Sequence, residues 1–292
     1  MQDLQGKVAV ITGAASGIGR ALADRAARDK MRLVLADIED GPLQQAAETL
    51  RAKGTEVLTV VANVSKAADV ENLAEQAFQH FGGAHVLFNN AGVSGETWIW
   101  KNSLENWEWI LGVNLWGVIH GIRAFVPRML EQNTECHIVN TSSFSGFLAF
   151  PGSGIYKATK HAVVSISETL ALEMEQIGAK IGVSVLCPGG VNTRIIEAER
   201  NRPRSSAQAK SAEPGPDDSE ASQKFWTRVF MTDSALPIQV ANQTFQAIRE
   251  NRFYILTHRQ YDAAIRRRLE MVMERGAPAN AITQLNDDRP AG

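Results

Sequence analysis

Tyr156 and Lys160, four residues apart, are the side chains of this 292-residue chain best placed to move a proton. A spacing of four puts both on one face of a helix. A free tyrosine has a pKa of about 10, which is too high for a base at neutral pH. A neighbouring cation favours the phenolate and lowers that pKa. The pair is therefore suited to act as a base in an oxidation and as an acid in a reduction.

A glycine-rich loop, Thr12-Gly-Ala-Ala-Ser-Gly-Ile-Gly19, follows the first apolar run. We expect Gly13 to allow a sharp turn, Gly17 to let the backbone approach a phosphate, and Gly19 to let the next helix pack closely. The free N–H groups at the start of that helix suit a pyrophosphate. The spacing Gly-x-x-x-Gly-x-Gly differs from the general Gly-x-Gly-x-x-Gly fingerprint of dinucleotide sites.

An acidic residue, Asp37, ends the second apolar run. A carboxylate at this place can accept hydrogen bonds from both hydroxyls of an adenosine ribose, and it repels a 2′-phosphate. Ser16 and Ile38 stand where a basic residue would bind that phosphate. The sequence therefore predicts NAD(H) as the cofactor.

The elements that must position these residues alternate along the first 190 residues. Short β-branched runs that are almost wholly apolar, as in strands covered on both faces, are separated by helical patterns. This alternation predicts an α/β fold with a doubly wound parallel sheet flanked by helices. The expected strands are 7–11, 32–37, 56–62, 85–88, 136–141, 181–186 and 252–257, and the expected helices are 18–29, 42–53, 67–81, 105–130, 156–176, 237–250 and 261–275.

The pattern changes after Arg194. Residues 201–222 are rich in Pro, Ser, Ala, Lys and acidic residues and have almost no apolar side chains, which is typical of a loop that cannot bury itself. We therefore expect one domain over residues 1–292. Its core would span about 6–257, its substrate lid about 194–232, and a C-terminal helix with a polar tail 259–292.

The composition disfavours several classes of protein. Thirty Lys and Arg against 32 Asp and Glu give a net charge of −2, whereas nucleic-acid-binding proteins are usually strongly basic. Cys136 and Cys187 are too few for a disulfide framework, and the six histidines lack metal-ligand spacing. We find no signal-peptide pattern and no apolar stretch near the roughly 20 residues that span a bilayer. We expect a cytoplasmic protein with no metal and no membrane or nucleic-acid partner.

Together the motifs resemble those of the short-chain dehydrogenase/reductase family. Thr12-Gly-x-x-x-Gly-Ile-Gly19, Asn89-Asn-Ala-Gly92, Asn114, Ser143, Tyr156-x-x-x-Lys160 and Pro188-Gly189 occur in the family's order and spacing, over about residues 6–257. The resemblance implies a Rossmann-type fold, an NAD-dependent oxidoreductase that acts on CH–OH groups, and assembly as a homodimer or homotetramer.

The resemblance also assigns four catalytic residues. Tyr156 would move the proton, and Lys160 would lower the tyrosine pKa and hold the nicotinamide ribose. Ser143 would fix the substrate oxygen, and Asn114 would anchor a water that links Lys160 to solvent. Ser143 takes this role in preference to Ser142 because twelve residues separate it from Tyr156, as in the family.

The cofactor site is carried over in the same way. Asn90 would brace the fourth strand, and Thr193 would hold the nicotinamide carboxamide. The chain departs from the family at Asn63, where Asp is usual, although an Asn carbonyl oxygen can still accept a hydrogen bond from the adenine amino group. The full set is Gly13, Ser16, Gly17, Ile18, Gly19, Asp37, Asn63, Val64, Asn90, Ala91, Gly92, Tyr156, Lys160, Pro188, Gly189, Val191 and Thr193.

Three segments wall the substrate pocket in this family, and here each of them supplies large apolar side chains. Their large side chains are Trp98, Ile99, Trp100, Phe144, Phe147, Leu148, Phe150, Ile195, Ile196, Phe225, Trp226 and Phe230, although most of them could instead be core or subunit contacts. Arg194 is the only basic residue expected nearby. These features predict as substrate a fairly bulky, hydrophobic secondary alcohol or its ketone, a small molecule with an aromatic or alicyclic ring.

Two other functions remain open from the sequence. One is a 3-oxoacyl-thioester (acyl carrier protein) reductase, which in this family usually takes NADPH, so Asp37 argues against it. The other is a catalytically silent binding protein on the same fold. Such a protein would be expected to lack part of the set Asn114, Ser143, Tyr156 and Lys160.

Overall fold

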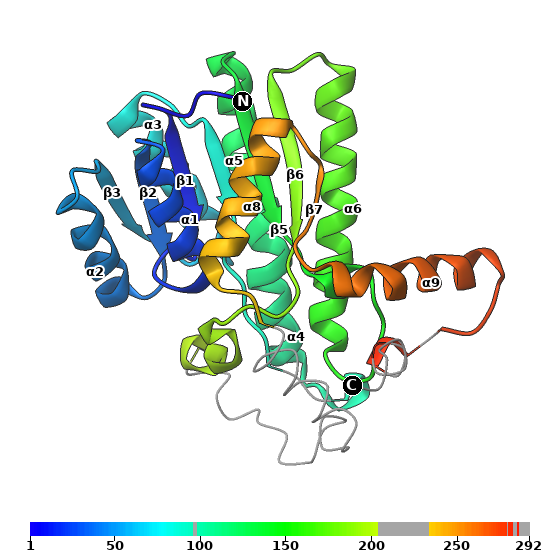
Figure 1. Cartoon of the computed structure of the whole chain (residues 1–292). Coiled ribbons are helices and arrows are strands. Elements are labelled where there is room, and N and C mark those ends of the chain that lie inside the picture. The colour runs from blue at the N-terminus through cyan, green and yellow to red at the C-terminus, as the bar shows by residue number, and fades with distance from the viewer. Residues whose placement is uncertain (96–97, 204–233, 279, 283–284, 286–292) are drawn as a thin grey trace.

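The computed structural model describes residues 1–95, 98–203, 234–278, 280–282 and 285 (Figure 1). Their strands form one seven-stranded parallel sheet in the order β3-β2-β1-β4-β5-β6-β7. The strands are β1 (Val8–Thr12), β2 (Arg32–Asp37), β3 (Val57–Val61), β4 (Val86–Asn89), β5 (Cys136–Thr141), β6 (Ile181–Cys187) and β7 (Tyr254–Leu256). The strand order reverses between β1 and β4, the kind of switch point at which doubly wound folds bind ligands.

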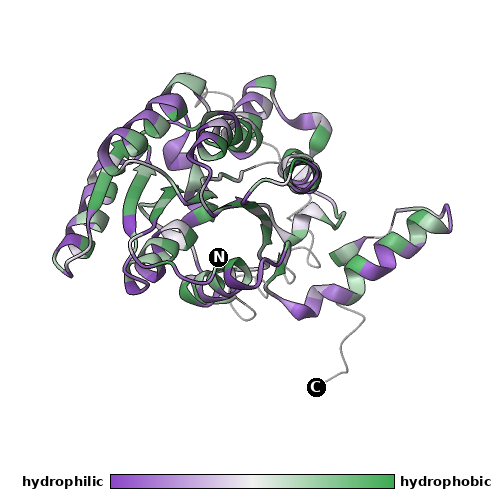
Figure 2. Ribbon diagram, turned by 90° about the horizontal axis from the view of Figure 1, so that it is seen from above, coloured by the Kyte–Doolittle hydropathy of each residue, from purple (hydrophilic) through white to green (hydrophobic). Residues whose placement is uncertain are grey.

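Helices cover both faces of this sheet, which confirms the predicted fold class (Figures 1 and 2). Successive residues of β1 point to opposite faces. Ala9 and Ile11 pack with one set of helices, and Val8 and Val10 pack with the other. The first set is α1 (Gly17–Arg28), α2 (Asp40–Arg51) and α8 (Pro237–Glu250), and the second is α3 (Ala67–Phe81), α5 (Gly117–Gln132) and α6 (Gly154–Gln176).

The region predicted as a single helix over 105–130 is more complex. It consists of α4 (Leu104–Leu111), a π-helical turn, η2 (Gly112–Trp116), and α5, which run on without a break. Among the described helices, the run Leu104–Gln132 is long and apolar enough to cross a membrane, but half of its most apolar window is buried inside the protein. We therefore interpret it as a core helix.

The C-terminal segment differs from the predicted polar tail. α9 (Asp262–Met273) extends away from the body of the protein (Figures 1 and 2). Beyond it, Ala281, Ile282 and Leu285 are buried in one cluster with Phe144. These three residues have the spacing of a helical face, but three apolar residues within a polar stretch are too few to predict a buried segment from the sequence. The chain thus returns to the loop after β5.

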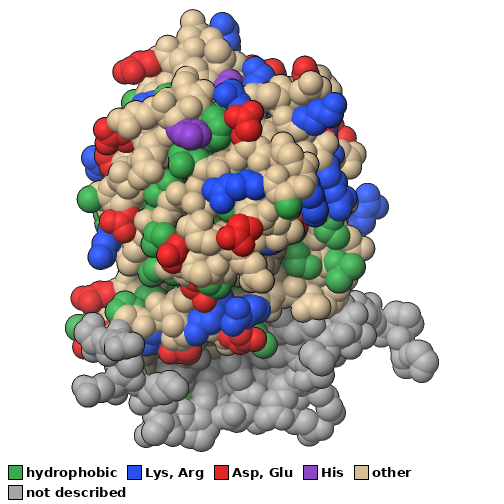
Figure 3. Space-filling model, turned by 90° about the vertical axis from the view of Figure 1, so that its left-hand side faces the viewer, with side chains coloured by type: hydrophobic (Ala, Val, Ile, Leu, Met, Phe, Trp, Pro, Cys, Tyr) green, Lys and Arg blue, Asp and Glu red, His purple; other side chains and the backbone are tan. Residues whose placement is uncertain are grey.

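Charges of both signs are interspersed on the surface. On the face at the left of Figure 1, Lys and Arg side chains alternate with Asp and Glu over the described residues (Figure 3). This face therefore lacks the single-signed basic stripe that would mark a nucleic-acid footprint.

Two histidines at the amino ends of neighbouring strands are held neutral. His137, in β5, is buried and its Nε2 lies 2.8 Å from Ser184 Oγ. Burial, with a smaller contribution from the N-terminal amino group, lowers the pKa of His137 to about 3. Burial and the nearby Lys7 and Arg32 lower the pKa of His85 to about 4.

These histidines should make the fold sensitive to acid. Below pH 6.5, the ordinary pKa of histidine, the histidines of the unfolded chain become protonated. The same histidines in the folded chain stay neutral until the pH reaches their lower pKa. Each histidine then lowers the free energy of unfolding by about 1.4 kcal/mol per pH unit. Urea unfolding at pH 7, 6 and 5 should show a smaller loss for His137→Gln than for the wild type. Equal slopes for the two proteins would contradict this assignment.

Candidate active site

A cavity of about 1180 Å³ gathers nearly every predicted site residue. The residues that line it follow the carboxyl ends of β1 to β6 or lie on α6, because parallel strands bring those ends to one edge of the sheet. All the predicted catalytic and cofactor-binding residues line this cavity except Gly19 and Asn114. Small-molecule sites usually occupy about 300–1,000 Å³, so this one has room for a large ligand.

The glycine loop leaves the start of α1 open toward the cavity. Ser16 is the N-cap residue, but its side chain makes no capping hydrogen bond, and the first turn holds no acidic residue. Gly17 has a φ of +55°, and a Cβ there would lie 3.1 Å from Thr193 Cγ2. A Cβ on Gly19 would lie 2.0 Å from the carbonyl oxygen of Gly13. Only glycine fits at Gly19, which holds the helix against the loop.

Asp37 is fixed by backbone donors at the edge of the cavity. Its Oδ2 accepts a hydrogen bond from Ala15 N at 2.9 Å, and its Oδ1 accepts one from Glu39 N at 3.0 Å. Burial raises the pKa of Asp37, and these two backbone donors oppose that effect. A carboxylate offers about four acceptor positions, so each oxygen retains capacity for a ligand hydroxyl.

The side chain of Asn63 makes hydrogen bonds within its own loop that the sequence did not predict. Its Oδ1 accepts hydrogen bonds from Ser65 N at 3.1 Å and from Ser65 Oγ at 2.7 Å. The oxygen expected to meet the adenine amino group therefore already has two donors within its own loop. Asn63 and Val64 both line the cavity, and their contact with a cofactor stays a prediction.

Asn90 ties the end of β4 to the end of β1. Its Nδ2 donates to Thr12 O at 2.9 Å, and its backbone N donates to Thr12 Oγ1 at the same distance. Thr12 Oγ1 in turn donates to Phe88 O at 3.2 Å. This network holds the switch point together and presents Ala91 and Gly92 on the cavity wall.

Asn114 lies behind the wall in the π-helical turn η2. It is fully buried, and its side chain makes paired hydrogen bonds to Val93: Nδ2 donates to the carbonyl oxygen at 2.9 Å, and Oδ1 accepts from N at 2.8 Å. The extra residue of a π-turn changes the direction of a side chain without ending the helix, and such turns are frequent at functional sites.

Tyr156 and Lys160 lie on adjacent turns of α6, with Lys160 Nζ 5.3 Å from the centre of the tyrosine ring. Lys160 Nζ also donates to Thr141 O at 3.0 Å. Burial lowers the pKa of Lys160 to about 8. A lysine with that pKa is still mostly protonated at pH 7, so a buried cation stands beside the phenol.

The two adjacent serines have different partners. Ser142 Oγ donates to Lys160 O at 2.8 Å, which commits it to the backbone of α6. Ser143 Oγ accepts from Ser145 N at 3.2 Å and lies 3.4 Å from Pro188 O, toward the predicted nicotinamide segment. Ser143 is therefore the one of the two with its hydroxyl toward the predicted nicotinamide segment, and its role at the substrate oxygen stays a prediction.

Two residues that the sequence analysis gave no role support the segment at Pro188. Gly189 N donates to His258 Nδ1 at 3.1 Å, and a Cβ on Gly189 would lie 2.4 Å from the ring of Tyr261. Tyr261 also stacks on Phe144 with the ring centres 4.4 Å apart. The sequence did not predict the contacts of His258 and Tyr261 with Gly189, because both residues lie far along the chain from the motifs.

The predicted apolar wall is only partly present. Phe144, Ile195 and Ile196 line the cavity, joined by Trp109 and Val93, which the sequence did not single out. The other predicted wall residues among those described do not line the cavity. Leu148, Phe150 and Phe147 pack in core clusters, Ile99 and Trp100 are exposed, and the ring of Trp98 lies against that of Trp100. Phe225, Trp226, Phe230 and most of the predicted lid lie outside the described residues. The described part of the predicted lid begins with a 3-10 helix, η4 (Arg194–Asn201), which directly follows Thr193.

Arg194 is not the only basic residue near the site, as the sequence had suggested. Arg200 and Arg202 also line the cavity, and each of the three arginines is paired with a glutamate. Arg202 lies over the Trp109 ring, 4.1 Å from its centre. Across the described ranges, we find no group of three or more His, Cys, Asp or Glu residues placed to hold a metal.

Comparisons with known proteins point in one direction. Residues 7–204 match the family model for short chain dehydrogenase. A CLA biosynthesis dehydrogenase/reductase of Lactiplantibacillus plantarum is 36% identical over 282 residues, which cover 95% of this chain and 97% of the relative. A 1-deoxy-11-beta-hydroxypentalenate dehydrogenase of Streptomyces arenae is 42% identical over 197 residues, which cover 66% of this chain and 70% of the relative.

A solved structure is similar over almost the whole chain. A short-chain dehydrogenase/reductase from Burkholderia phymatum in complex with NAD superposes with a TM-score of 0.89. It is 45% identical, and the match covers 96% of this chain and 99% of that one.

Proposed function

Because the chain belongs to the short-chain dehydrogenase/reductase family, we propose that it is an NAD(H)-dependent oxidoreductase that interconverts a hydrophobic secondary alcohol and its ketone. The observation that carries this proposal is the shared cavity. Tyr156, Lys160 and Ser143 line the same space as the glycine loop and Asp37. In this proposal, the proton-transfer group and the dinucleotide site share one cavity.

The residues present fit a bound NAD. The uncapped start of α1 offers N–H groups to the pyrophosphate, and Asp37 offers carboxylate oxygens to the adenosine ribose. Gly17, Gly189 and Thr193 would lie along the dinucleotide, with Lys160 at the nicotinamide ribose. The relative from Burkholderia phymatum, similar over nearly its full length, was solved with NAD. When bound, NAD accepts a hydride and NADH donates one.

The side chains of this chain would handle the proton and the substrate oxygen. In the oxidation, the phenolate oxygen of Tyr156 would take the proton of the substrate hydroxyl and become a neutral phenol, while the bound cofactor would accept the hydride from the carbon that carries that hydroxyl. Ser143 Oγ holds that oxygen in place. The Lys160 ammonium, held by Thr141 O, stabilises the negative charge on Tyr156. Asn114 fixes Val93 and so keeps the facing wall in position. The reduction runs through the same groups in reverse.

The charge and polarity of the wall favour an apolar substrate. Trp109, Val93 and Phe144 supply apolar surface. The arginines on the wall already have glutamate partners, so a substrate carboxylate would have to displace one of them. The name of the pentalenate relative denotes a compound with both a hydroxyl and a carboxylate, so this relative supports chemistry at a CH–OH group but does not support the exclusion of a carboxylate.

A series of secondary alcohols tests the substrate class. With NAD, catalytic efficiency should rise from 2-propanol to 2-octanol, and 1-phenylethanol should also be accepted. Each buried CH₂ is worth about 0.8 kcal/mol, or roughly fourfold. The matched control is 2-hydroxyoctanoate, in which a carboxylate replaces the methyl group next to the carbinol of 2-octanol. A flat series, or a preference for the hydroxy acid, would show that the substrate class is wrong.

A further inference from the structure

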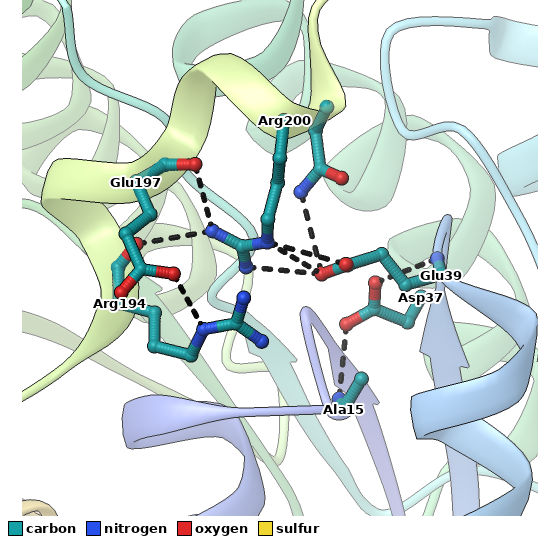
Figure 4. Close-up of polar contacts among 7 residues, drawn as sticks. Ala15, Asp37, Glu39, Arg194, Glu197 and Arg200 are labelled. Carbon is teal, nitrogen blue, oxygen red and sulfur yellow. Dashed lines mark hydrogen bonds and ion pairs between the residues drawn. The ribbon is translucent and has the colours of Figure 1, made fainter.

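Two charged side chains from segments far apart in the sequence meet at the cavity wall. Glu39 lies just after β2, at the start of α2, and Arg200 lies near the end of η4, 161 residues further along the chain. Arg200 Nη2 is 3.0 Å from Glu39 Oε2, and Arg200 Nε is 3.2 and 3.3 Å from the two carboxylate oxygens (Figure 4). Both residues line the cavity.

The guanidinium of Arg200 is held on its other side as well. Its Nη1 donates to the backbone oxygens of Arg194 at 3.1 Å and Glu197 at 3.0 Å (Figure 4). The ion pair is partly buried, since 24% of the Arg200 side chain and 21% of the Glu39 side chain are exposed. The hydrogen bond from Arg200 lowers the pKa of Glu39, which keeps the carboxylate charged. The guanidinium of Arg200 is therefore fixed by the backbone of η4 on one side and by the Glu39 carboxylate on the other.

The ion pair lies beside the part of the cavity where the adenosine of the cofactor is expected to bind. Glu39 N donates to Asp37 Oδ1, so the pair begins beside the predicted ribose acceptor. Thr193, immediately before η4, packs against Gly17 of the glycine loop. The segment from Thr193 to Arg200 is thus tied at its start to the phosphate-binding loop and at its end to the turn after β2.

We propose that Glu39 and Arg200 form a clasp that holds the dinucleotide at its adenosine end and slows its release. The proposal rests on the proposed function, because it requires that a dinucleotide occupies this cavity. Release would require the end of η4 to separate from α2, and therefore the ion pair to break. A partly exposed ion pair contributes little to overall stability. Its effect should therefore be visible in the dissociation rate and small in the melting temperature.

The test is the dissociation rate of NADH, measured by stopped-flow fluorescence after mixing the complex with excess NAD. Glu39→Gln and Arg200→Gln should each raise the rate by roughly two- to fivefold. The double variant should be no faster than either single one, because both remove the same interaction. The exchanged pair, Glu39→Arg with Arg200→Glu, should recover part of the slow release.

A matched control is available in another ion pair between distant elements. Arg249 on α8 pairs with Asp29 at the end of α1, with 29% and 18% of the side chains exposed, and neither residue lines the cavity. Arg249→Gln should release NADH at the wild-type rate. If Arg200→Gln fails to fold, as judged by its melting temperature, Arg200→Lys keeps the charge, loses the two-pronged contact and should still release faster.

The outcomes separate the clasp from the proposed function. Wild-type protein that binds no NADH would contradict the proposed function itself. Wild-type protein that binds NADH, with variants that release it at the wild-type rate, would overturn the clasp and leave the proposed function standing. Variants that lose affinity only through slower association would also overturn the clasp.

Discussion

Tyr156→Phe should lower the turnover number by about 10²–10⁴-fold while leaving the fold and NADH binding largely intact. The substitution removes one hydroxyl group, and a general acid–base group typically contributes that factor. The phenyl ring can occupy the space of the phenol beside Lys160, so packing around α6 is retained. Steady-state rates with the best alcohol of the series and NAD measure the loss, and NADH fluorescence measures the binding.

Another conservative change near the same helix provides the control. Ser142→Ala also deletes one hydroxyl close to Lys160, but Ser142 Oγ donates to a helix carbonyl and so should have no proton to exchange with substrate. It should keep a rate within a few-fold of the wild type. A Tyr156→Phe variant with more than half of the parental rate would refute the proton-transfer role.

NAD should be preferred over NADP by at least about tenfold in catalytic efficiency, and Asp37→Ala should narrow that preference. A 2′-phosphate would face the Asp37 carboxylate, and each 1.4 kcal/mol of repulsion corresponds to a factor of about ten. Arg200 is a cation on this part of the cavity wall, but it is paired with Glu39. The measurement is kcat/KM with each cofactor for both proteins, at one ionic strength because salt screens exposed charges.

Two results would count against this assignment. The first is wild-type efficiency with NADP equal to or better than that with NAD. The second is an Asp37→Ala variant that loses activity with both cofactors in the same proportion. Asp37 would then hold the glycine loop through Ala15 N and take no part in discrimination.

The strand pattern and the motifs together predict most of the site. β2, β5, α3 and α8 begin and end at the predicted residues. Apolar runs specify buried parallel strands, and parallel strands bring the residues that follow their carboxyl ends to one edge. Residues as far apart as Asp37 and Ser143 therefore line one cavity, as their order along the strands implies.

Other features depend on contacts that no local pattern encodes. The pairing of Glu39 with Arg200 joins residues 161 positions apart, and neither belongs to a motif. The return of Ala281 and Ile282 to the loop after β5 rests on a few apolar residues in a polar stretch. The departure of 112–116 from α-helical geometry leaves no mark in the apolar periodicity, because the residues on either side keep a helical pattern.

The π-helical turn η2 also changes the direction in which side chains point before and after it within one continuous helical run. Inserting one residue into a regular α-helix rotates everything after it by about 100°. A π-turn absorbs one additional residue, so α5 can keep its apolar side on the sheet while Asn114 bonds to Val93. One helical run therefore both directs Asn114 to the cavity wall and packs α5 on the sheet. Deleting one residue between Gly112 and Trp116 should turn either Asn114 or the apolar side of α5 away from its partner by about 100°.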